Sequence, residues 1–237
     1  NIKTKFMNEG FATIVHEKIM NKLFNRGFLT SEEHAEFSYS NSLVKAHNPL
    51  QLNPYLLGSK IWEDVEDRWN KGRHGTDWDN CILISEKENW DTGEGKGWDK
   101  VKEVMSMYTD WMFMQSYLTK DIVDDLELYL VKAVQTPQTI DIVRRDDPAE
   151  ITRKVIINSF AHSGIPKIVV ENGNLFGSKI LELKHKFAGQ QLQSKYAMET
   201  LKHLKKLWGY DIKLTTKIDD TEIYFYTTGD EVKVEKA

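Results

Sequence analysis

The chain has 237 residues, a formal net charge of -4 at neutral pH and a hydrophobic content of 40%. A chain of this size can bury one large core or two ordinary ones, and we expect two domains. The small negative charge excludes a general attraction for nucleic acid or for an anionic membrane, and no apolar run approaches the roughly 18 residues of a membrane span. The single cysteine, Cys81, excludes an intramolecular disulfide and favours a reducing compartment, with the cytoplasm as the expected location.

The first helix is expected from about residue 5 to Arg26, because Gly27 is a natural left-handed terminator. At about 100° per residue, one face of this helix combines apolar side chains with Glu9 and His16. This acid and this histidine therefore point toward the expected core. A buried ionisable group costs free energy unless it is paired or coordinated, so both residues need a partner.

Helical spacing continues through the N-terminal half. Thr30 and Glu33 form a capping box that opens a second helix through about Leu43. Two Asn-Pro steps predict a long ordered loop over residues 47–58, before helical spacing resumes over residues 58–69. Residues 70–97 are expected to be irregular, and two further helices are expected over residues 98–118 and 120–134. Residues 1–134 are thus predicted to form a mainly helical region.

The pattern changes after residue 137. Strands are predicted near residues 139–143, 167–170, 179–183, 210–216 and 222–226, with helices after Pro148 and over residues 190–208. The order β-α-β-β-α-β-β is that of a ferredoxin-like βαββαβ domain with one added strand. The predicted fold class is therefore α+β, with a helical region at 1–134, a ferredoxin-like domain at 137–229 and a tail at 230–237. This domain has neither a Gly-rich nucleotide loop nor an aromatic ladder for RNA bases, which favours an assembly or regulatory role.

Four separated motifs occur in the chain. They are Asn8-Glu9-Gly10-Phe11-Ala12 with His16 two turns on, Asn53-Pro54-Tyr55-Leu56-Leu57-Gly58, Phe113-Met114-Gln115-Ser116-Tyr117-Leu118-Thr119, and Leu204-Lys205-Lys206-Leu207-Trp208-Gly209-Tyr210. With these motifs in this order, the chain resembles the SpoVR family, stage V sporulation protein R, over essentially its whole length. It looks like the C-terminal part of such a protein, whose upstream portion would carry a His-x-x-Gly-His element that is absent here. Phe11 stands where many relatives have Trp, a departure that leaves the polar positions unchanged.

The resemblance implies a role for Glu9. An Asn-Glu-Gly-aromatic-Ala helix is similar to the third-ligand helix of glutamate-type zinc peptidases, in which a carboxylate completes two imidazoles around a metal with an open position. Glu9 is then a metal ligand on a zincin-like helix fragment, and the other two ligands would come from the upstream portion of the same protein. His16 lies about 10.5 Å further along the helix axis, which makes direct co-ligation awkward. We therefore expect His16 to be a supporting or transition-state donor, with metal ligation as the weaker alternative.

Two functions from different classes follow from the resemblance. The first is a metal-dependent, zinc-type hydrolase-like protein that acts on amide bonds, with bacterial sporulation and spore-cortex peptidoglycan as its implied setting. Because two ligands would lie upstream of Asn1, the chain alone is expected to be inactive. The second is a non-catalytic scaffold whose C-terminal domain binds a protein. The implied partner is a serine protein kinase, which is often encoded beside members of this family.

Each polar candidate also has a structural interpretation. Glu9 can be a buried acid paired with Lys or Arg, His16 a satisfied core histidine, and Asn8 a first-turn residue. The second Asn-Pro step favours rigid loop packing over a placement of Tyr55 or His47 near the site. Two clusters are weaker candidates, since one lacks any standard zinc spacing and the other is more typical of a solvated helix face than of a site for an anionic partner. The first comprises His74, Asp77, Asp79 and Cys81, and the second Lys202, His203, Lys205 and Lys206.

Overall fold

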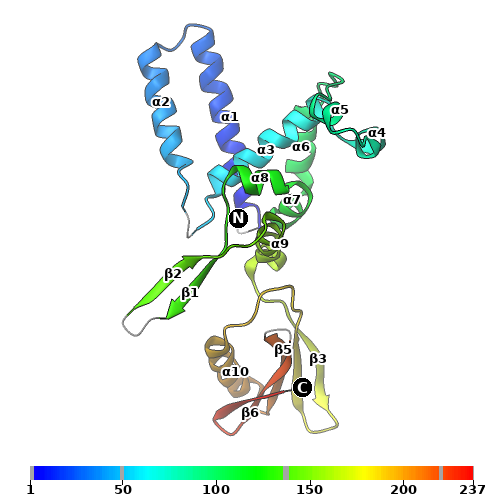
Figure 1. Cartoon of the computed structure of the whole chain (residues 1–237). Coiled ribbons are helices and arrows are strands. Elements are labelled where there is room, and N and C mark those ends of the chain that lie inside the picture. The colour runs from blue at the N-terminus through cyan, green and yellow to red at the C-terminus, as the bar shows by residue number, and fades with distance from the viewer. Residues whose placement is uncertain (1–2, 49–50, 136–138, 219–220, 237) are drawn as a thin grey trace. The chain divides into compact units, whose positions relative to one another are not determined.

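The structure is a computed structural model that describes residues 3–48, 51–135, 139–218 and 221–236 (Figure 1). Contacts between residues divide the chain into two compact units, Asn1–Ile157 and Asn158–Ala237, which are described separately below. The first unit is mainly helical and the second contains a five-stranded sheet, so the predicted α+β class is confirmed. No helix among the described residues is both long and apolar enough to cross a membrane.

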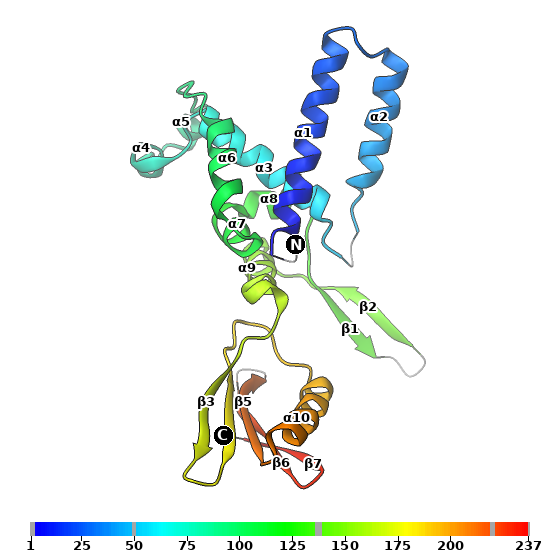
Figure 2. The ribbon, with the colours of Figure 1, turned by 180° about the vertical axis from the view of Figure 1, so that it is seen from behind.

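The first unit, called the helical unit from here on, also carries a two-stranded hairpin. Its helices are α1 (Lys5–Asn25), α2 (Ser31–Val44), α3 (Pro54–Asn70), α4 (Gly75–Asn80), α5 (Ile84–Glu88), α6 (Gly97–Met107), α7 (Asp110–Tyr117), α8 (Lys120–Asp125) and α9 (Ala149–Ser159), whose last two residues lie beyond the boundary. Strands β1 (Val131–Gln135) and β2 (Ile140–Arg144) pair antiparallel, with Val131 opposite Arg144. Figures 1 and 2 show that α1 and α2 form an antiparallel pair and that the β1–β2 hairpin extends away from the helices of this unit.

Local signals place the ends of the first two helices as predicted. α1 ends ahead of Gly27, whose φ of +73° is left-handed. At the start of α2, the Thr30 side chain accepts a hydrogen bond from the Glu33 backbone N–H, and the Glu33 carboxylate accepts one from the Thr30 N–H. The predicted capping box is thus confirmed.

The second Asn-Pro step begins a helix instead of continuing a loop. The Asn53 side-chain oxygen accepts a hydrogen bond from the N–H of Tyr55, and Pro54 occupies the first helical position, where its missing N–H is not needed. The Asn53 amide also donates to the carbonyls of Val44 and Ala46. α3 therefore starts earlier than residue 58, and its start is tied to the end of α2.

Three other boundaries differ from the prediction. Residues 70–97 contain the short helices α4 and α5, and the helix expected over residues 98–118 is divided into α6 and α7. The helix expected to reach Val134 ends at Asp125, because Glu127 adopts a left-handed conformation with a φ of 48°. The β-branched residues beyond it pair with β2, a non-local contact that helical spacing does not reveal.

α1 and α3 cross at a very short distance. A Cβ atom on Gly10 would lie 2.2 Å from the carbonyl carbon of Gly58, and one on Gly58 would lie 2.2 Å from the carbonyl oxygen of Phe6. Only glycine fits at both positions, because any other residue would place a side-chain atom inside the neighbouring backbone. One turn further along α3, the Trp62 indole N–H donates to the Met7 carbonyl at 3.0 Å, which ties the two helices together.

The core of the helical unit surrounds this crossing. Its fully or almost fully buried apolar side chains are Met7, Ile14, Leu57, Ile61, Trp62, Val65, Val101, Val104, Phe113, Met114, Tyr117, Leu118, Ile122, Val123 and Ile156. All of them except Leu118, which directly follows α7, come from α1, α3, α6, α7, α8 and α9, whereas α2 contributes no buried residue. The crossing of α1 and α3 is therefore the fixed centre of this unit, and α2 lies at its margin.

The second unit, called the sheet unit from here on, has one main helix. Its elements are a short 3₁₀ helix (Ala161–Gly164), β3 (Ile168–Leu175), β4 (Ile180–His185), α10 (Ser194–Trp208), β5 (Ile212–Ile218), β6 (Thr221–Thr228) and β7 (Glu231–Lys236). The strand order is β3-β4-β5-β6-β7, with β4 and β5 parallel and joined through α10, and with the other pairs antiparallel. The buried cluster on the α10 side comprises Leu181, Leu183, Leu201, Ile212, Leu214, Ile223 and Phe225.

The sheet does not have the predicted ferredoxin-like arrangement. The first strand of that prediction is β2, which pairs with β1 in a separate sheet. The parallel strands β4 and β5 are direct neighbours, whereas a split βαβ unit has another strand between its parallel pair. The segment expected to be a tail is strand β7, which pairs antiparallel with β6 as β6 does with β5.

Candidate functional site

Glu9 and Tyr55 meet beside the crossing of α1 and α3. Glu9 directly precedes Gly10 on α1, and Tyr55 lies one turn before Gly58 on α3. Both side chains are half-buried, and the Tyr55 hydroxyl makes a hydrogen-bonding interaction with the Glu9 carboxylate. The two glycines let the helices approach closely enough for this contact. The Asn-Glu-Gly motif and the Asn-Pro-Tyr-Leu-Leu-Gly motif therefore form one site in space.

The carboxylate of Glu9 changes the acidity of Tyr55. The hydrogen bond to Glu9, followed by the negative charge of Glu9, raises the pKa of the Tyr55 hydroxyl above its ordinary value of about 10. The hydroxyl therefore stays protonated to a higher pH than that of an ordinary tyrosine. The stability that this contact contributes is present below pH about 10 and is lost as the pH rises through the raised pKa of Tyr55.

This contact predicts a change in titration. Glu9→Gln is expected to lower the pKa of Tyr55 toward its ordinary value, because the amide keeps an acceptor but removes the charge. Tyrosinate absorbance measures this, with Tyr55→Phe subtracted in each background to isolate one of the nine tyrosines. An unchanged Tyr55 titration in Glu9→Gln would show that the two groups are not in contact in solution.

His16 does not lie in the core. The residues of α1 that are buried are Met7, Gly10, Thr13 and Ile14, whereas His16 is exposed and Ile19 is 50% exposed. The predicted buried face was wrong because α1 packs against α3 through Gly10. The side of α1 that is buried is therefore the side that carries this glycine, and not the side with the largest apolar side chains. The His16 ring instead meets the Phe37 ring of α2 edge-on, with centroids 4.9 Å apart.

The other residues of the first motif have structural contacts. The Asn8 amide donates to the Thr4 hydroxyl at 3.2 Å, as suits a residue in the first turn. Phe11 stacks on Trp98, with ring centroids 5.8 Å apart, and meets Trp62 edge-on at 6.3 Å. His47 is exposed, and its ring centroid lies 6.5 Å from that of Tyr129. Of the two loop residues considered near the site, Tyr55 is brought to Glu9.

The four residues of the first weak cluster, His74, Asp77, Asp79 and Cys81, do not form a common site. The His74 ring stacks on Trp69 with centroids 4.8 Å apart, and its Nε2 lies 3.3 Å from a carboxylate oxygen of Glu94. Asp77 and Asp79 lie on α4, and the Cys81 thiol is directed to the Leu83 carbonyl. These residues are close in sequence, but the contacts described for them are with different partners.

The basic cluster on α10 is used within the sheet unit. Lys205 Nζ lies 2.7 Å from Asp211 Oδ1 and donates to the Gly229 carbonyl at 2.7 Å. Lys202 pairs with Glu199 at 2.8 Å. These contacts agree with the interpretation of a solvated helix face.

The donor set at Glu9 does not complete a zinc site. Across the part of the chain that the structure describes, no three His, Cys, Asp or Glu side chains are grouped so that they could hold a metal ion. Glu9 offers one carboxylate, and its neighbour Tyr55 is a hydroxyl. A zinc ion is held by three or four protein ligands, so Glu9 could supply only one of them.

Sequence reasoning missed one buried acid. Asp110, at the start of α7, is 4% exposed and accepts hydrogen bonds from the backbone N–H groups of Phe6 and Met7 at 3.0 and 2.9 Å. It therefore holds the helix that carries Glu9. Its partners are more than a hundred residues away in sequence, so no local pattern marks it.

The structure thus defines a mixed α+β protein whose helical unit presents a Glu–Tyr pair at a glycine-mediated helix crossing. The family described as "SpoVR like protein" matches residues 1–165, and the family described as "SpoVR-like C-terminal domain" matches residues 166–219. The chain belongs to the SpoVR family, as the four motifs predicted.

One curated relative is "Uncharacterized protein YcgB" of Escherichia coli (strain K12). It is 23% identical over 240 residues, which cover 93% of this chain and 43% of the relative. The chain therefore spans less than half the length of that relative. No solved structure matches the chain significantly.

Proposed function

We propose that this chain forms one wall of a metal-dependent, hydrolase-like site in a longer SpoVR-family protein, with Glu9 as one metal ligand. The observation that carries the proposal is the interaction of the Glu9 carboxylate with the Tyr55 hydroxyl, beside the Gly10–Gly58 crossing. Carboxylates that bind metals are themselves commonly hydrogen-bonded, which fixes their orientation. Tyr55 is the positioning residue in this proposal, and the zincin-like character of α1 is part of it.

The remaining ligands and the substrate lie outside the described contacts. Two imidazoles from another part of the longer protein would complete the metal set, and an amide bond in spore-cortex formation is the proposed target. His16 belongs to the proposal as a donor to substrate and not as a ligand. Its exposed ring lies about 10 Å further along the axis of α1 than Glu9.

The test measures metal in the longer protein by elemental analysis. We expect about one zinc-type ion per chain, loss of that ion in Glu9→Gln, and a metal affinity about 10 to 100-fold weaker in Tyr55→Phe. The matched controls are Glu36→Gln and Tyr39→Phe on α2, where both side chains are exposed. The 237-residue chain alone is expected to show no hydrolysis. Stoichiometric metal that survives Glu9→Gln would refute the ligand assignment.

A second candidate function is a non-catalytic scaffold that binds a protein such as a serine protein kinase. The β1–β2 hairpin favours it, because Val131, Val134, Ile142 and Val143 are between 38% and 57% exposed. An isolated two-stranded hairpin with exposed apolar side chains is marginally stable in water. Kinase binding that is lost in Ile142→Asp and kept in Glu9→Gln would favour the scaffold over the hydrolase.

A further inference from the structure

The helix α10 covers only part of one face of the sheet unit. An α-helix is about 10 Å across and strands lie about 4.8 Å apart, so one helix covers about two strands. Figures 1 and 2 agree that α10 lies on the side of β5 and β6, with β3 on the opposite side of this unit. In the strand register, Ile168 is opposite His185 and Val170 is opposite Leu183. Both β3 residues therefore face the α10 side, yet they are 42% and 63% exposed.

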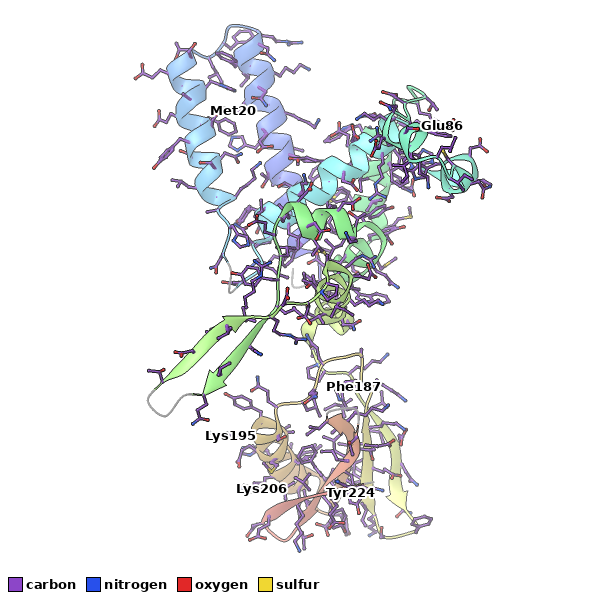
Figure 3. All side chains as sticks on the ribbon, in the orientation of Figure 1. Met20, Glu86, Phe187, Lys195, Lys206 and Tyr224 are labelled. Atoms are coloured by element: carbon purple, nitrogen blue, oxygen red, sulfur yellow. The ribbon has the colours of Figure 1, made fainter. Side chains whose placement is uncertain are left out.

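A groove of about 650 Å³ lies between α10 and the strands β3, β4 and β5. Its floor is formed by Ile168, Leu183 and Leu214, from three successive strands. The rest of the lining is apolar or uncharged and polar, and α10 contributes Tyr196, Thr200 and Leu204 to it. Figure 3 labels Phe187, in the segment that leads from β4 to α10, and Lys195, in the first turn of α10. None of the described residues that line the groove is charged, so a charged group inserted here would be desolvated without a partner.

The two edges of the sheet differ in a way that singles out β3. The edge strand β7 has the sequence Glu-Val-Lys-Val-Glu-Lys, and charged side chains of this kind protect an edge from pairing with other chains. The first half of the edge strand β3 is Ile168-Val169-Val170, which is apolar and regularly paired with β4 until the register shifts after Val170. The unprotected edge is thus the one beside the groove.

We propose that β3 and this groove bind an extended, uncharged peptide segment of a protein partner. The segment adds as a strand beside Ile168–Val170 and inserts an apolar side chain toward α10. Main-chain hydrogen bonds to the edge strand supply affinity, and the groove supplies specificity. The inserted side chain extends an existing apolar row, because Leu214 pairs with Leu183 and Leu183 pairs with Val170 across the sheet. A bound helix would use the groove but would leave the apolar β3 edge without a role.

The experiment selects binders from a library of random seven-residue peptides displayed on phage, with the 237-residue chain as target. We expect selected peptides to have apolar residues at alternate positions and no charge among them. A synthetic selected peptide should bind about tenfold more weakly to Val170→Lys and to Thr200→Glu, since each places a charge at the contact. Both positions are exposed, so the substitutions leave the core intact. The matched control is Val234→Lys on β7, where the wild-type residue is 49% exposed and affinity should not change.

Hydrogen exchange provides a second readout. The amides of Ile168–Val170 that face the open edge of β3 should become protected when the peptide binds, and Glu9→Gln should bind it as the wild type does. Three results would each overturn the proposal: no peptide whose binding depends on Val170, selected peptides with apolar residues at helical spacing, or unchanged exchange along β3.

Discussion

Gly58→Ala is expected to lower the free energy of unfolding of the helical unit by about 2 kcal/mol. The added Cβ would lie 2.2 Å from the Phe6 carbonyl oxygen and 2.9 Å from the Gly10 Cα. Both are backbone atoms, so no side-chain rotation relieves the overlap and the helices must move apart. Overpacking of this kind costs about 3 kcal/mol, against a gain of about 1 kcal/mol from the better helix propensity of alanine.

Urea unfolding followed by tryptophan fluorescence measures this loss. All tryptophans except Trp208 lie in the helical unit, so the signal reports mainly on that unit. Ser40→Ala on the exposed surface of α2 is the control and should stay within about 0.5 kcal/mol of the wild type. If Gly58→Ala were as stable as Ser40→Ala, the close crossing would not exist in solution.

The same substitution tests how the site is built. When α1 and α3 separate, the Tyr55 hydroxyl moves away from Glu9, and its pKa should return toward the ordinary value. A variant that loses stability and the pKa shift together shows that the glycines of the two motifs serve the site as well as the fold. This links the Asn-Glu-Gly and Leu-Gly sequences through one physical contact.

The parts of the fold that could be predicted from the sequence are those set by short-range chemistry. The end of α1 at Gly27, the Thr30 capping box and the helix after Pro148 each depend on a few neighbouring residues. β1 and β7 were missed because each depends on a partner strand, β2 or β6, that local spacing does not specify. The buried face of α1 was misjudged for a similar reason, since the contact with α3 is made through Gly10.

The candidate site was predictable only in part. Glu9 was singled out by its motif, whereas its partner Tyr55 was assigned to loop packing, because the meeting of α1 and α3 is a tertiary contact. One signal was present in the sequence: each motif carries a glycine within a helical segment, and a glycine in a helix interior is unfavourable unless close packing requires it. Two such helices are candidates to pack against each other.

Asp110 is the second position where a large effect is expected, because it replaces a missing helix cap. The residue before α1, Thr4, makes no side-chain capping bond. The carboxylate of Asp110 instead accepts hydrogen bonds from the backbone N–H groups of Phe6 and Met7, and the backbone N–H of Asp110 donates to the Lys3 carbonyl at 2.7 Å. A negative charge at a helix N-terminus is also favourable to the helix dipole. One buried acid thus fixes both the start of α1 and its attachment to α7.

Asp110→Ala is therefore expected to destabilise the helical unit by about 3 kcal/mol, since it leaves two N–H groups without their charged acceptor. Asp110→Asn keeps one acceptor oxygen and should lose about half as much. The matched control is Asp99→Ala in the first turn of α6, whose side chain is 80% exposed and whose loss should be below about 1 kcal/mol. If urea unfolding gave Asp110→Ala a free energy of unfolding as high as that of Asp99→Ala, the result would contradict the capping role. Because α1 carries Glu9, the hydrogen bonds that Asp110 accepts from Phe6 and Met7 also attach to α7 the turn of α1 that precedes this carboxylate.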